Sequence, residues 1–143
     1  MKISNYIKLE FPAKSANEGF ARAAVAVFAA QLDPTLDEIS DIKTAVSEAV
    51  TNCIVHAYPN EMGVIKLKAS IKNDVLEIII ADRGHGISDI NKAIQPLYTT
   101  GGEERSGMGF TIMDSFCDKM RVRSKEGKGT TVTLQKRIRS KNI

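Results

Sequence analysis

The chain has 143 residues, 43% hydrophobic and 26% charged, and its formal net charge is +3. This length predicts a single domain over residues 1–143, and the small net charge gives no indication of a nucleic-acid partner. No apolar run approaches the length of a membrane span and the N-terminus has no hydrophobic signal segment, so we expect a cytoplasmic protein without a membrane partner.

The first third of the chain predicts a strand followed by a helix. Residues 7–11 alternate apolar and polar side chains, as in a half-buried strand, and Pro12 ends this pattern. Ser15 and Glu18 have the spacing of a capping box, which predicts a helix that begins there. Asp33 and Pro34 end this helix. We expect its inward side to carry Phe20, Ala24, Val27 and Phe28.

The middle of the chain predicts a long helix and two strands. Thr35 and Glu38 form a second capping-box pattern before the longest helical periodicity. Residues 65–71 and 75–81 read as strands joined by a turn at 72–74. The apolar side of the helix is expected to carry Ile39, Ile42, Val46, Ala49, Val50, Cys53 and Ala57.

The last third predicts a long loop, a helix and a hairpin. Residues 88–107 look irregular, which indicates a functional or mobile loop. Residues 109–117 read as a helix, and residues 120–124 and 130–134 as the strands of a final hairpin. This order of elements predicts an α/β (α+β) two-layer sandwich, with a mixed, largely antiparallel sheet and helices on one face. The two cysteines, Cys53 and Cys117, are expected to be reduced and buried.

The segment that follows the strand at residues 75–81 is the first candidate for ligand binding. Asp82 begins it, and Gly84 and Gly86 flank His85. A carboxylate before two glycines combines a fixed acceptor with an exposed backbone, which can hold a flat ligand closely. The alternative is an ordinary tight turn.

The long helix carries a second candidate pair, Glu48 and Asn52. Residues four apart lie on the same helix face, and both lie opposite the stripe of Ile42, Val46 and Val50. An amide oxygen is a suitable ligand for Mg²⁺ beside phosphates, and a carboxylate one turn earlier can accept a proton during phosphoryl transfer. A solvated polar helix face is the alternative.

Two glycine-containing segments complete the pattern. Residues 105–109 (RSGMG) join the long loop to a helix, where free backbone N–H groups suit phosphate. The chain has neither a P-loop nor a dinucleotide-binding fingerprint. Gly129, Thr130 and Thr131 enter the last predicted strand and could also form a simple hairpin turn.

In their order along the chain, which begins with Glu48 and Asn52, the four motifs resemble those of the GHKL superfamily of ATPases and kinases, and the resemblance covers nearly the whole chain. Residues 47–52 (SEAVTN), 95–100 (QPLYTT) and 104–113 (ERSGMGFTIM) further resemble the bacterial anti-sigma factor serine kinases, most closely those of sporulation. Residues 20–22 and 31–35 share this likeness. The resemblance implies the GHKL ATP-binding fold for the whole chain.

The resemblance also implies a role for each motif residue. Asp82 would accept a hydrogen bond from the adenine amino group, with Thr130 beside it through a water. Asn52 would hold Mg²⁺ against the phosphates of ATP, and Glu48 would be the general base. Gly84 and Gly86 would let the adenine ring approach the backbone. An ATP lid over residues 99–109 would include Thr99, Thr100, Gly107, Met108 and Gly109, with Arg105 reaching the terminal phosphate.

The implied function is that of a serine kinase and anti-sigma factor. Such a protein inhibits a sporulation sigma factor, acts as a homodimer and phosphorylates a serine on an anti-anti-sigma protein. Arg22, on the outer side of the first helix, is the candidate partner contact. His56 and His85 are expected to be structural. The alternatives are an ATP-dependent binding module without kinase activity, a relative acting on a stress-response sigma factor, and a stand-alone ATPase or histidine-kinase-like domain.

Overall fold

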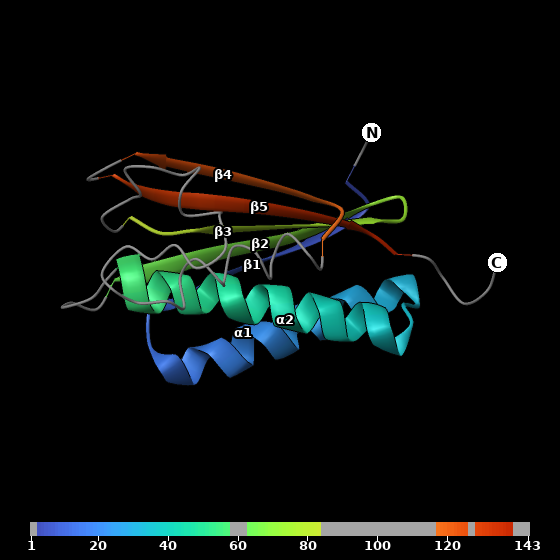
Figure 1. Ribbon diagram of the computed structural model, residues 1–143. Coiled ribbons are helices and arrows are strands. Elements are labelled where there is room, and N and C mark those ends of the chain that lie inside the picture. The colour runs from blue at the N-terminus through green and yellow to red at the C-terminus, as the bar shows by residue number, and fades with distance from the viewer. Residues whose placement is uncertain (1–2, 58–62, 84–116, 126–127, 139–143) are drawn as a thin grey trace.

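The computed structural model describes residues 3–57, 63–83, 117–125 and 128–138. They form two layers, a sheet of five strands and a pair of helices that cover one of its faces (Figure 1). The α+β two-layer prediction is therefore confirmed. The strands are β1 (Asn5–Pro12), β2 (Val64–Lys72), β3 (Val75–Ala81), β4 (Lys119–Lys125) and β5 (Gly129–Arg137), and the helices are α1 (Ser15–Ala29) and α2 (Leu36–Asn52).

The sheet has the strand order β1-β2-β3-β5-β4, and each neighbouring pair of described strands is antiparallel. The last strand along the chain, β5, therefore lies between β3 and β4. This arrangement sets Ala81, the last residue of β3, opposite Thr131 near the start of β5. The end of β3 and the beginning of β5 therefore lie at the same end of the sheet, and Asp82 follows β3 there.

The core lies between the sheet and the two helices. Strand residues alternate between this core and the opposite, open face, as a period of two requires. On β3, for example, Leu76, Ile78 and Ile80 are at most 3% exposed, whereas Glu77 and Ile79 between them are half-buried. The helices contribute Ala21, Val25, Phe28, Ala29, Ile42, Ala45, Val46, Ala49 and Val50.

The orientation of α1 differs from the prediction. Phe28 is buried as expected, but Phe20 and Val27 are 60% and 74% exposed, and Ala24 is only half-buried. The core side of α1 is instead formed by Ala21, Val25, Ala26, Phe28 and Ala29. Apolar residues lie on two faces of this helix, so periodicity alone selects the wrong one.

The predicted capping box at Ser15 is also wrong. The N-cap of α1 is Lys14, which makes no side-chain capping bond. Glu18, the expected capping carboxylate, instead accepts a hydrogen bond from Ser47 Oγ of α2 at 2.6 Å. A tertiary contact between the helices therefore takes the place of the local one.

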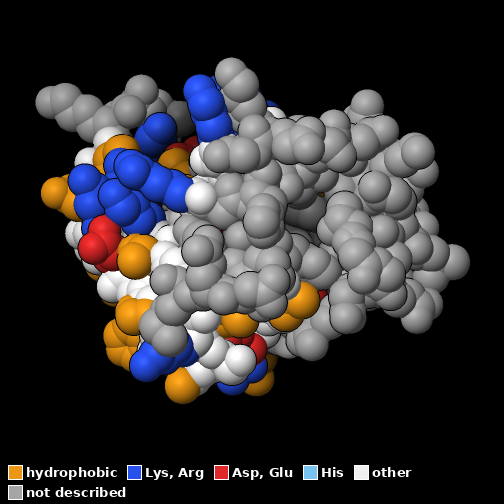
Figure 2. Space-filling model, turned by 90° about the vertical axis from the view of Figure 1, so that its left-hand side faces the viewer, with side chains coloured by type: hydrophobic (Ala, Val, Ile, Leu, Met, Phe, Trp, Pro, Cys, Tyr) orange, Lys and Arg blue, Asp and Glu red, His pale blue; other side chains and the backbone are white. Residues whose placement is uncertain are grey.

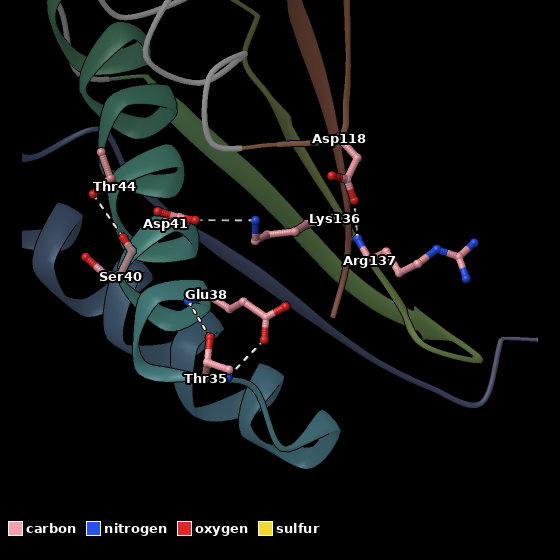
Figure 3. A network of polar contacts seen from close by, with 8 residues as sticks. All are labelled: Thr35, Glu38, Ser40, Asp41, Thr44, Asp118, Lys136 and Arg137. Carbon is pink, nitrogen blue, oxygen red and sulfur yellow. Dashed lines mark hydrogen bonds and ion pairs between the residues drawn. The ribbon is translucent and has the colours of Figure 1, made fainter. Parts of the chain in front are cut away.

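The start of α2 matches the prediction. Thr35 Oγ1 accepts from the Glu38 backbone N–H at 3.1 Å, and Glu38 Oε1 accepts from the Thr35 N–H at 2.9 Å (Figure 3). Further along α2, Asp41 pairs with Lys136 of β5 at 3.4 Å, which joins the helix layer to the sheet. The capping box fixes the start of α2, and the ion pair ties the helix to β5.

Candidate functional site

Asp82 and Thr130 lie together at the end of the sheet where β3 ends and β5 begins. The Asp82 N–H donates to the Thr130 carbonyl at 2.9 Å, and the Thr130 N–H lies 3.3 Å from the Asp82 carbonyl and 3.2 Å from Asp82 Oδ1. Thr130 Oγ1 also lies 2.8 Å from Ser124 Oγ of β4. The two residues that the sequence assigned to one base-binding position are therefore adjacent in the structure.

Gly129 makes this close approach possible. Its φ is +107°, in the region that favours glycine. A Cβ built at this position would lie 2.2 Å from the Asp82 carbonyl oxygen and 2.6 Å from the Arg83 Cα. No other residue type fits here without moving the backbone of β5 away from Asp82.

Cys53 connects Asp82 to the helix layer. It follows the last residue of α2 and begins the π-helix η2 (Cys53–Ala57). Its thiol donates to Asp82 Oδ2 at 3.4 Å, and both side chains are buried. Burial and, after it, the negative charge of Asp82 raise the pKa of the Cys53 thiol, so the thiol remains a protonated donor. The prediction of a buried thiol is confirmed for Cys53, although its contact with Asp82 was not foreseen, and it is wrong for Cys117, which is only partly buried.

Asn52 precedes Cys53 and offers an amide that the described fold does not use fully. Its Nδ2 is buried without a hydrogen-bond partner among the described residues. A buried donor without a partner carries a desolvation cost, which indicates that the side chain serves another purpose. Orientation of this amide toward a ligand would account for that cost, and its oxygen is a hard donor of the kind that Mg²⁺ prefers. Asn52 therefore fits the expected metal through its amide oxygen, whereas its unpartnered Nδ2 could only donate to a ligand such as a phosphate oxygen.

A hollow of about 280 Å³ opens beside Asp82 and Thr130. It is lined by residues of the β4–β5 hairpin that the sequence did not single out, among them Arg123, Ser124 and Lys128. Two cationic side chains near a candidate nucleotide site suit negatively charged phosphates. Nothing in the local pattern of a basic hairpin distinguishes these residues from ordinary surface positions, so sequence reasoning missed them.

Glu48 and Arg22 lie in a different place. Both line a groove of about 420 Å³ between α1 and α2, together with Ser47 and Lys43. Arg22 is exposed and pairs with Glu18 at 3.7 Å. The structure thus places the expected base beside the expected partner contact, while Glu48 does not line the Asp82 hollow.

The remaining predicted site residues lie outside the described part of the chain. They are Gly84, Gly86, Thr99, Thr100, Arg105, Gly107, Met108 and Gly109. His85, the predicted loop at 88–107 and nearly all of the predicted helix at 109–117 also lie outside it. Within the described residues, no cluster of three metal-ligating side chains occurs. No described helix is long and apolar enough to cross a membrane.

Comparison with protein families gives a match over most of the chain. Residues 11–136 match the family described as "Histidine kinase-like ATPase domain". A protein named "Anti-sigma F factor" from a Thermoanaerobacter species is 57% identical over 98% of this chain and 99% of its own length. Another of the same name from Clostridium kluyveri is 56% identical over 92% of this chain and 94% of its own.

Two solved structures share the fold at low sequence identity. A part of a structure that contains the RsbU and RsbW domains of a Mycobacterium tuberculosis protein superposes with a TM-score of 0.67 at 20% identity, over 94% of this chain and 33% of that one. The mycobacterial sensor histidine kinase MprB superposes with a TM-score of 0.59 at 15% identity, over 94% of this chain and 99% of its own. The similarity extends to the whole two-layer architecture.

Proposed function

This chain belongs to the histidine kinase-like ATPase domains and, within them, to the anti-sigma F factors, and on this premise we propose that it is an ATP-dependent protein serine kinase. It would hold a sporulation sigma factor in an inactive complex, as a homodimer in the cytoplasm. It would also phosphorylate a serine of an anti-anti-sigma protein.

The observation that carries the nucleotide part is the position of Asp82. One buried carboxylate is held from the sheet by Thr130 and from the end of α2 by Cys53, next to Asn52. A fixed acceptor at this point suits the adenine amino group, with Gly84 and Gly86 allowing the base to approach. Asn52 would then lie on the phosphate side, which agrees with its unpartnered amide.

The remaining residues would supply positioning and proton transfer. Bound at Asn52, Mg²⁺ would supply neutralisation of phosphate charge. Glu48 would accept the proton of the attacking serine hydroxyl, and Arg105 in a lid over residues 99–109 would stabilise the charge that develops on the transferred group. The lid residues Thr99, Thr100, Gly107, Met108 and Gly109 would contact the nucleotide. Phosphate on the antagonist adds about −1.5 to −2 charges, enough to disrupt an interface.

A second function, nucleotide-dependent binding of the sigma factor without phosphoryl transfer, is favoured by one observation. Glu48 lines the groove with Arg22 rather than the Asp82 hollow. In this alternative, Glu48 and Arg22 would both serve partner binding.

The variant Glu48→Gln distinguishes the two functions. The protein is incubated with labelled Mg-ATP and an anti-anti-sigma protein, and bound sigma factor is recovered by pull-down. If Glu48 is the base, label on the antagonist serine falls by about 10²-fold or more, while ATP and sigma-factor binding persist. A phosphoryl-transfer rate in this variant equal to that of the wild type would exclude Glu48 as the base. An absence of transfer by the wild-type protein itself would favour the binding module.

A further inference from the structure

The open face of the sheet, opposite α1 and α2, carries an unusual distribution of charge. The strand register places Lys8, Lys68, Ile79, Thr133 and Arg121 in one row across all five strands. The next row on this face, nearer the end of the sheet at which Asp82 lies, contains Glu10, Lys66, Ala81, Thr131 and Arg123. In these two rows, cations lie toward both outer strands, with Glu10 beside Lys66, and uncharged residues occupy the middle.

These cations form two ridges. The first ridge consists of Lys8, Lys66, Lys68 and Lys72 on β1 and β2, and the second of Lys119, Arg121 and Arg123 on β4. Lys and Arg side chains gather on the sheet side of the molecule in Figure 2, which views the end near the β4–β5 hairpin. Between the ridges, β3 and β5 carry the uncharged side chains Ile79, Ala81, Thr131 and Thr133 on this face, and we call this band the trough. A depression of about 390 Å³ beside the first ridge includes Ile79 and Ala81.

The fold does not neutralise this charge. On the first ridge, Lys66 pairs with Glu10 at 3.8 Å, but Lys8 and Lys68 have no ion pair with a described acidic residue, and neither do Arg121 and Arg123. Lys8 and Lys68 lie directly opposite each other, an arrangement that destabilises a sheet. Both ammonium groups lie over the Tyr6 ring, at 5.8 and 5.6 Å from its centroid. The Tyr6 ring offsets part of this repulsion, and the positive charge that remains on the face favours an acidic partner.

We propose that this face binds a helix of a partner protein that carries acidic side chains on both flanks of an apolar stripe. The ridges on β2 and β4 are three strand spacings apart, about 14 Å. An α-helix with its side chains is about 10–12 Å across, so it fits the trough and reaches both ridges. Its apolar stripe would contact Ile79 and Ala81, and its carboxylates would pair with the ridge cations.

The same features argue against nucleic acid as the ligand. Glu77 lies on the midline of the face, where it would repel phosphates and carboxylates alike, so only the ridges at the flanks suit anionic groups. The Tyr6 ring is already engaged by two lysines, so it is poorly placed to stack with a base. The inference rests on Lys8, Lys68 and Arg121, which line no part of the Asp82 hollow, although Arg123 of the second ridge does line it.

Two synthetic peptides test the geometry with the full-length protein. Both form helices of the same composition with a leucine stripe, but one has glutamates on both flanks and the other on one flank only. The two-flank peptide should bind at least about tenfold more tightly, and more weakly as salt rises. Equal affinities of the two peptides, or no binding, would contradict the proposal.

Charge reversals identify the surface. Lys68→Glu and Arg121→Glu should each weaken binding of the two-flank peptide by about tenfold, whereas Lys14→Glu, an equal change of charge at the start of α1, should leave it unchanged. Lys68→Glu should leave the free energy of unfolding nearly unchanged, since it removes the repulsion with Lys8 together with the contact between Lys68 and Tyr6. Equal losses in all three variants would overturn the proposal. So would tighter binding of a single-stranded oligonucleotide through the same residues, or self-association that either reversal on the sheet abolishes.

Discussion

Single side chains at the end of the sheet where β3 and β5 meet carry most of the proposed chemistry. Asp82 accepts from the Thr130 backbone through Oδ1 and from the Cys53 thiol through Oδ2, which fixes the orientation of its carboxylate. A fixed and buried acceptor discriminates strongly between ligands, because a ligand without the matching donor leaves it poorly satisfied. Substitutions at these positions should therefore affect ligand choice as well as stability.

Asp82→Asn tests the role of the carboxylate in adenine recognition. The amide of asparagine would present a donor toward groups that are themselves donors, including the adenine amino group. We expect ATP affinity to fall by at least about tenfold, or about 1.4 kcal/mol, as measured by calorimetry. Asp37→Asn, an exposed position in the first turn of α2, is the control and should bind normally. Unchanged affinity in a folded Asp82→Asn protein would show that this loop is only a turn.

Cys53 should make stability depend on pH in the alkaline range. Its pKa is raised above the ordinary value of 9.0 because the thiol is buried and faces Asp82. The native state therefore keeps the proton above about pH 9 while the unfolded chain loses it, so stability falls as pH rises, by up to about 1.4 kcal/mol per pH unit.

Cys53→Ala should remove this contribution. The difference in the free energy of unfolding between wild type and variant is measured by denaturant titration from pH 7 to pH 10. It should shrink as the pH rises above about 9, because the wild type alone loses the stability that depends on the Cys53 proton. A difference that stays constant over this range would contradict the expected titration.

At the scale of elements, the β4–β5 hairpin is positioned by backbone contacts rather than by side-chain packing alone. Gly129 starts β5 where its backbone touches that of Asp82 and Arg83. The hairpin also supplies Arg123, Ser124 and Lys128 to the hollow. The position of β5 beside β3 therefore determines the geometry of the site.

Gly129→Ala should disrupt this contact. Its Cβ would meet the Asp82 backbone, and its φ of +107° is strained for alanine. We expect a loss of about 2–4 kcal/mol in the free energy of unfolding, with weaker ATP binding. Gly19→Ala in α1 is the matched control, because its nearest contact is the end of the Arg22 side chain at 3.6 Å. This change should stabilise the protein by up to about 1 kcal/mol. Similar effects of both substitutions would contradict the close-approach argument.

At the scale of the whole molecule, local patterns predicted the elements better than their contacts. Strand alternation and the Thr35 capping box were sufficient because each depends on neighbouring residues. The predicted orientation of α1 was wrong. Both Phe20 and Val27 on one face and Val25 and Ala29 on another are apolar, and only packing against the sheet decides which face is buried. The contact between Cys53 and Asp82 joins residues 29 apart in different layers, and no local pattern indicates it.

Because this contact joins the layers, nucleotide binding should stabilise both of them. At an ATP concentration of about 100 times Kd, a ligand that binds only the native state adds about 2.7 kcal/mol to the free energy of unfolding. Hydrogen exchange should slow most at the end of α2 and the start of β5, and least in β1 at the far edge of the sheet. GTP is the control, since guanine has an oxygen where adenine has its amino group and would face the Asp82 carboxylate. Equal protection by ATP and GTP, or protection confined to one layer, would contradict a site in which Asp82 joins the two layers.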